Sequence, residues 1–120
     1  MEIDGLLRNG RARLVDAKKS HNSLESRFDL AYNAAHAFSL AALRHRGYRP
    51  NKIRYIVFQA LPLTLNLDEA VWRVLDKAHN LRNSAEYEGH FEVGEQLLND
   101  LIKSADAVFK ALQDAIKEQE

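Results

Sequence analysis

Residues 22–46, NSLESRFDLAYNAAHAFSLAALRHR, decide the fold of this chain. Apolar side chains recur along this stretch at steps of three and four residues, which is the spacing of one face of an α-helix. They form two rows, Leu24, Phe28, Ala31, Ala35, Phe38 and Ala42 in the first and Leu30, Ala34, Ala37 and Ala41 in the second. A helix that is apolar on two sides must be covered on two sides, so the stretch predicts the central helix of a bundle.

The ends of this helix carry local signals. Asn22 is followed three positions later by Glu25, an asparagine version of the capping box, so Asn22 is the expected N-cap. Gly47 stands where a C′ glycine would end the helix. One polar strip remains on the helix, formed by Glu25, Asp29, Asn33 and His36. This strip is either solvated surface or one wall of a functional groove.

Three other stretches repeat the helical spacing and predict long helices at about residues 4–19, 66–89 and 93–117. Their core positions are Ile3, Leu7, Leu14 and Ala17 in the first, Val71, Val74, Ala78, Leu81 and Ala85 in the second, and Leu98, Leu101, Ala105, Val108 and Leu112 in the third. Asn66 is the expected cap of the second. With residues 22–46, these stretches predict an all-α, antiparallel, up-and-down bundle of four long helices.

Gly10 lies on the apolar face of the first helix. Glycine in a helix interior costs about 1 kcal/mol relative to alanine, so its presence needs a reason. Close approach of another helix is one explanation, and a kink is the other.

A short additional helix is expected at residues 51–61, between two of the long ones. Residues 53–58 are also rich in β-branched and aromatic side chains, which favour a strand. We predict a helix, because no second stretch of the chain offers a strand to pair with it. Pro62 is expected to end this helix.

Composition indicates one globular domain spanning residues 1–120. The chain has no cysteine, which excludes disulfides and thiol chemistry. Its 17 basic residues are balanced by 17 acidic ones, which argues against a dedicated duplex-DNA binder. Its first residues do not resemble a secretory signal, and no apolar run approaches the roughly 20 residues that span a bilayer. We therefore expect a cytoplasmic protein without membrane association.

The clearest candidate for recognition or chemistry is the polar face of residues 79–89. At 100° per residue, four side chains share one helix face with a phenol on its flank: His79, Arg82, Asn83 and Glu86, then Tyr87. The purely structural alternative is an ion pair between Arg82 and Glu86, four residues apart, with Tyr87 covering the end of the bundle.

A second candidate is the basic stretch that follows the central helix. It contains no acidic residue and interleaves tyrosines with cations: Arg44, His45, Arg46, Tyr48, Arg49, Lys52, Arg54 and Tyr55. Such a stretch can hold a phosphate backbone and stack bases. It can equally be a solvated helix end whose cations the helix dipole favours.

Other chemistries lack their motifs. There is no glycine-rich phosphate loop, no nucleophile elbow, no zinc-protease helix and no calcium loop. The five histidines show no ligand spacing. We expect neither a metal nor a cofactor.

Three segments together resemble the HEPN superfamily (higher eukaryotes and prokaryotes nucleotide-binding). Residues 81–89, LRNSAEYEG, are similar to its late-helix motif, and residues 26–35, SRFDLAYNAA, to its second-helix signature. Residues 47–50, GYRP, match the turn that usually ends that second helix. The resemblance covers about residues 20–115. It implies a HEPN-like helical domain, usually a homodimer, of a kind found in metal-independent endoribonucleases, in toxins of toxin–antitoxin pairs and beside nucleotidyltransferases.

The resemblance also assigns roles within the polar face. Family ribonucleases carry an Arg, four to six further residues, and a His. Arg82 fits the Arg, Asn83 fits the polar residue after it, and Tyr87 stands where the His would be. A phenol with an ordinary pKa near 10 is a weak base at pH 7, so this exchange favours binding over cleavage.

The expected site therefore has two parts. The catalytic candidates are Arg82, Asn83 and Tyr87. The candidates for RNA or phosphate binding are Arg82, His79, Glu86, Arg46, Arg49, Lys52 and Arg54. The leading expectation is a dimer that binds RNA or a nucleotide-related partner, with a nucleotidyltransferase or antitoxin as possible partners. The alternatives are a metal-independent ribonuclease toxin, with His79 or His90 replacing the missing His, and an interaction module without a nucleic-acid role.

Overall fold

All regular secondary structure is helical within the residues that the computed structural model describes. These are residues 2–47, 55–88 and 93–118, with side chains described for all of them except 55, 56 and 84–88. The helices are α1 (Glu2–Ala17), α2 (Leu24–His45), α3 (Tyr55–Gln59), α4 (Leu61–Thr64), α5 (Glu69–Glu88) and α6 (Glu95–Glu118). The predicted all-α class is confirmed. None of these helices is both long and apolar enough to cross a membrane.

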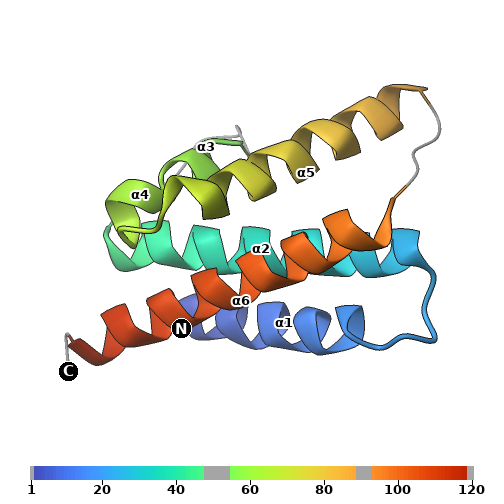
Figure 1. Ribbon diagram of the computed structural model, residues 1–120. Coiled ribbons are helices and arrows are strands. Elements are labelled where there is room, and N and C mark those ends of the chain that lie inside the picture. The colour runs from blue at the N-terminus through green and yellow to red at the C-terminus, as the bar shows by residue number, and fades with distance from the viewer. Residues whose placement is uncertain (1, 48–54, 89–92, 119–120) are drawn as a thin grey trace.

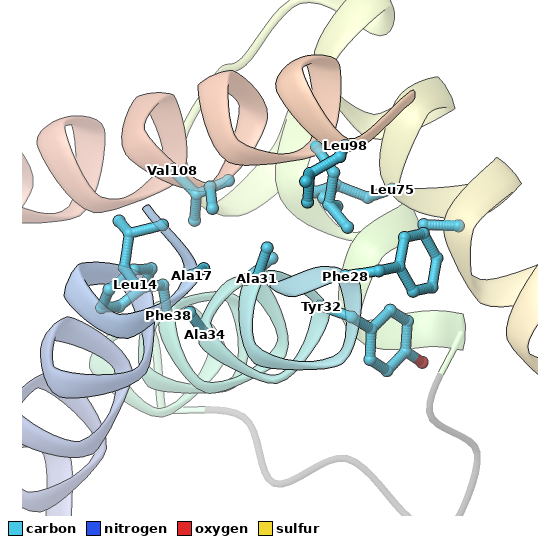
Figure 2. Close-up of a cluster of buried hydrophobic side chains, with 14 of the residues drawn as sticks. Leu14, Ala17, Phe28, Ala31, Tyr32, Ala34, Phe38, Leu75, Leu98 and Val108 are labelled. Carbon is cyan, nitrogen blue, oxygen red and sulfur yellow. The ribbon is translucent and has the colours of Figure 1, made fainter. Parts of the chain in front are cut away.

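Helix α2 occupies the middle of the arrangement, as its two apolar rows predicted. It lies between α1 and α5, with α6 crossing it (Figure 1), and it contacts all of the other helices. Its buried positions come from both rows: Phe28, Ala31, Ala35, Phe38 and Ala42 from the first, and Ala34, Ala37 and Ala41 from the second. Side chains from four helices meet in the core (Figure 2), namely Leu14 from α1, Phe28 and Phe38 from α2, Leu75 from α5, and Leu98 and Val108 from α6.

Gly10 marks a close contact between α1 and α2. Helix α1 runs unbroken through Gly10. A Cβ atom at Gly10 would lie 2.5 Å from Cε1 of Phe38, which is shorter than van der Waals contact. Close approach is therefore the reason for this glycine, because the aromatic ring fills the space that a side chain would need.

The predicted N-caps were wrong for two helices. Ser23 rather than Asn22 caps α2, since its side chain accepts a hydrogen bond from the Ser26 amide at 3.1 Å. Asn22 instead donates to the backbone oxygen of Asp16 and ties the α1–α2 turn together. Helix α5 begins at Glu69, three residues after Asn66, which has a φ of 54°. Asparagine tolerates this left-handed conformation, so Asn66 serves the turn and not the cap.

The C-terminal glycine signal of α2 is confirmed. Gly47 has a φ of 87°, and its amide donates to the Arg44 carbonyl at 2.9 Å. This is the left-handed geometry that glycine provides at the end of a helix without steric cost.

The short helical region after α2 differs from its prediction in one respect. Residues 55–59 are helical, so a strand is wrong for the described part of residues 53–58, and residues 51–54 lie outside the description. Pro62 does not end a helix but lies in the first turn of α4, which makes two short helices where one was predicted. Proline fits there because the first amides of a helix have no partner within it.

Candidate functional site

The polar face of α5 meets α2, and a buried histidine lies at the centre of the contact. His79 is only 8% exposed, although it was predicted as a phosphate-binding side chain. Its Nδ1 atom lies 2.8 Å from the hydroxyl of Tyr32 on α2. Its Nε2 atom lies 3.0 Å from the side-chain amide of Asn83, one turn further along α5. Both ring nitrogens therefore engage neighbouring side chains.

A neutral imidazole satisfies this chain of hydrogen bonds in two ways. The Tyr32 hydroxyl donates to Nδ1 while the Nε2 proton is donated to the Asn83 carbonyl, or the Asn83 amide donates to Nε2 while Nδ1 donates to Tyr32. Aromatic neighbours fix the plane of the ring, with Tyr32 stacked on it at 6.2 Å and the edge of Phe58 at 6.4 Å. The buried imidazole of His79 thus positions the side chains of Tyr32 and Asn83.

Arg82 lies beside this cluster and is partly open to solvent. Its guanidinium carbon sits 4.8 Å from the centroid of the Tyr32 ring, a cation–π arrangement. Its Nε atom lies 3.5 Å from a carboxylate oxygen of Asp29. The Arg82 side chain is 24% exposed and that of Asp29 is 50% exposed, so solvent screens this pair and it contributes at most about 1 kcal/mol. The contacts orient the guanidinium without enclosing it.

The polar strip of α2 therefore forms part of the candidate site. Asp29 belongs to that strip and reaches Arg82 on α5. His36, also in the strip, lies edge to face against Phe58 at 6.0 Å. The strip remains largely solvated, since the Asp29 side chain is half exposed and Glu25 at its start is exposed.

Sequence reasoning did not select Tyr32 as a site residue. It is 1% exposed and joins His79 to Arg82, through its hydroxyl and its ring face respectively. Figure 2 shows its ring beside Phe28 with the hydroxyl directed away from the apolar side chains. Its position three residues after Asp29 and four before His36 places it beside the polar strip, and that was the available signal.

Several predicted site residues lie outside the described part of the chain. The side chains of Glu86 and Tyr87 are among them, and so are Arg49, Lys52 and Arg54 of the basic stretch, together with His90. The predicted ion pair between Arg82 and Glu86 consequently stays a prediction. The ion pair that the structure does give Arg82 is with Asp29.

The described part of the basic stretch makes contacts within the protein. Arg44 forms an ion pair with Glu2 at the start of α1. Arg46 is exposed, and its Nε atom donates to the backbone oxygen of Thr64 on α4 at 3.1 Å. These contacts tie the end of α2 to α1 and α4. The structure does not bring Arg46 together with the cluster around Arg82.

The cluster around Arg82 offers a planar cation and an exposed amide, two groups that can donate hydrogen bonds to an oxyanion. An oxyanion would have to take the place of the Asp29 carboxylate at the guanidinium. Within residues 2–47, 55–88 and 93–118, no group of three or more His, Asp or Glu side chains could hold a metal ion. No protein-family model matches this chain, and no curated protein matches it.

Proposed function

We propose that this chain is a HEPN-like domain that binds RNA, or a nucleotide-bearing partner, through Arg82 and Asn83 on α5. In this proposal the four long helices form an antiparallel up-and-down bundle. Two copies associate so that the Arg82 faces of both lie along one groove. A nucleotidyltransferase or an antitoxin is the class of protein partner that the resemblance suggests.

The observation that carries the proposal is the setting of Arg82. Its guanidinium rests on the Tyr32 ring, its Nε faces Asp29, and 24% of the side chain remains exposed. An arginine held in one orientation loses less conformational entropy when it binds, and its planar fork matches two phosphate oxygens. Asn83 is exposed one residue further on and can add a hydrogen bond.

Binding is favoured over cleavage by the state of His79. A ribonuclease that used His79 in place of the missing family His would need that ring to reach the ribose 2′-hydroxyl. His79 is buried, and its two nitrogens already lie within hydrogen-bond distance of Tyr32 and Asn83. The imidazole therefore supports the site from behind and does not face a substrate.

Arg82→Ala is expected to weaken binding of short single-stranded RNA by about tenfold or more, the value of a charge-assisted hydrogen bond to phosphate. The measurement is a fluorescence-anisotropy titration at two salt concentrations. Loss of one phosphate contact should also lower the number of counterions released on RNA binding by roughly one, as measured by the salt dependence of the binding constant.

Arg73→Ala is the matched control. Arg73 lies on the same helix and pairs with Glu69 four residues away, and its side chain is 68% exposed. Its removal changes the net charge by the same amount, yet should leave RNA affinity within about twofold of wild type. Equal RNA affinity of wild type and Arg82→Ala, with the helical circular-dichroism spectrum intact, would remove Arg82 from the proposal.

A further inference from the structure

A cavity lies away from Arg82, where the end of α2 meets the short helices α3 and α4. The cavity has a volume of about 460 Å³. Its described lining consists of Leu43, Arg46, Ala60, Leu63 and Thr64. Pockets of about 300–1,000 Å³ that combine apolar walls with a few fixed polar groups are typical of small-molecule sites.

The apolar part of this cavity includes an unusually exposed leucine. Leu63 is 85% exposed, whereas Leu61 and Thr64 on the same short helix are 0% and 3% exposed. Helix α4 is thus anchored by two side chains and presents Leu63 outward beside the cavity. A ligand that enters the cavity can bury part of this side chain.

The polar groups at this cavity are the Thr64 hydroxyl and the Arg46 guanidinium. The Thr64 hydroxyl oxygen is buried and has no hydrogen-bond partner among the residues that the structure describes, which is rare for a buried polar atom in a native protein. Arg46 is exposed, and its Nε atom is held on the Thr64 backbone oxygen at 3.1 Å. A ligand oxygen in the cavity can therefore reach the oriented Arg46 guanidinium, whereas the Thr64 hydroxyl lies enclosed behind the cavity wall.

We propose that this cavity binds a small amphipathic carboxylate, with the carboxylate on Arg46 and the alkyl chain along Leu43, Ala60 and Leu63. Arg46 supplies a positive charge to the described lining, which matches an anionic head group. The apolar side chains around it disfavour a fully solvated phosphate backbone. Arg46, predicted as an RNA contact, is assigned here to a separate ligand.

The test is a titration of the whole chain with octanoate, followed by the NMR signals of the Leu43, Leu63 and Thr64 methyl groups. Saturable shifts of these three signals are expected. Octylammonium has the same chain and the opposite charge, and should bind about tenfold more weakly or not at all. Octanoate that causes no saturable shift, or octylammonium that binds equally well, would overturn the proposal.

Two variants test whether the Arg46 guanidinium and the Thr64 hydroxyl contact octanoate. Arg46→Gln keeps a donor for the Thr64 carbonyl but removes the charge, and should weaken octanoate binding about tenfold. Thr64→Val keeps the shape and should leave octanoate affinity within about twofold of wild type, because the hydroxyl is enclosed, and it should raise the melting temperature, because it removes the unpartnered hydroxyl. Unchanged octanoate affinity in Arg46→Gln would contradict the assignment. Loss of RNA affinity in that variant without any octanoate binding would return Arg46 to the RNA surface.

Discussion

Gly10→Ala is expected to lower the free energy of unfolding by about 2 kcal/mol, although alanine is the better helix former. The new Cβ would lie 2.5, 2.9 and 3.0 Å from three atoms of the Phe38 ring. That ring is fully buried and packs against Phe109 with centroids 4.9 Å apart, so it cannot move aside cheaply. The gain in helix propensity, about 1 kcal/mol, is smaller than the cost of separating α1 from α2. Urea unfolding followed by circular dichroism measures the difference.

Gly5→Ala is the matched control on the same helix. Apart from its chain neighbours and the backbone of its own helix, no described residue has an atom within 4 Å of a Cβ added at Gly5. This variant should be up to about 1 kcal/mol more stable than wild type, because only the propensity term acts. Phe38→Leu should reduce the cost of Gly10→Ala when the two are combined, since it shortens the opposing side chain. Gly10→Ala with wild-type or higher stability would show that the helices separate freely at this contact.

The second large effect is expected for Tyr32→Phe, which should destabilise the protein by about 1–3 kcal/mol. The substitution removes the hydroxyl that lies 2.8 Å from Nδ1 of His79, between groups that are 1% and 8% exposed. Water cannot readily replace it there, because both side chains are buried and Phe58 packs against the Tyr32 ring. The phenyl ring remains, so the stacking of Arg82 should persist.

Asn83→Ala is the control for this prediction. It removes the partner of the other imidazole nitrogen, 3.0 Å from Nε2, but Asn83 is exposed and water can take its place. Its cost should stay below about 1 kcal/mol. A double variant with His79→Leu should be less destabilised than the sum of Tyr32→Phe and His79→Leu, because both partners of one hydrogen bond are then gone. Strict additivity would contradict the coupling of Tyr32 to His79.

The architecture was readable from the sequence where a single helix carried the information. Two apolar rows on residues 24–42 required cover on two sides, and α2 is indeed the helix that contacts all of the others. Gly10, a glycine within a helix, likewise indicated a close contact with another helix. The caps were not readable, because Asn22 and Ser23 are both good cap residues and are adjacent. The choice depends on the tertiary hydrogen bond that engages Asn22 with Asp16.

The candidate site was readable only in part, for a related reason. Helical spacing placed His79, Arg82 and Asn83 on one face of α5, and the structure brings them together. Spacing within one helix cannot reveal the rotation of that face toward α2, so the burial of His79 was missed. The contacts from His79 to Tyr32 and from Arg82 to Asp29 cross about half the chain, and periodicity carries no information about such pairs.

Binding of RNA phosphate by Arg82 is tested most directly by NMR, with the Arg82 Nε–H signal followed while short single-stranded RNA is added. Binding of phosphate to the guanidinium changes the hydrogen bond at this atom, which now faces Asp29 at 3.5 Å. The Arg82 signal is expected to shift saturably with the same apparent affinity as RNA binding, while the Arg73 signal stays in place. RNA binding that leaves the Arg82 signal unmoved would contradict the RNA-binding role proposed for Arg82.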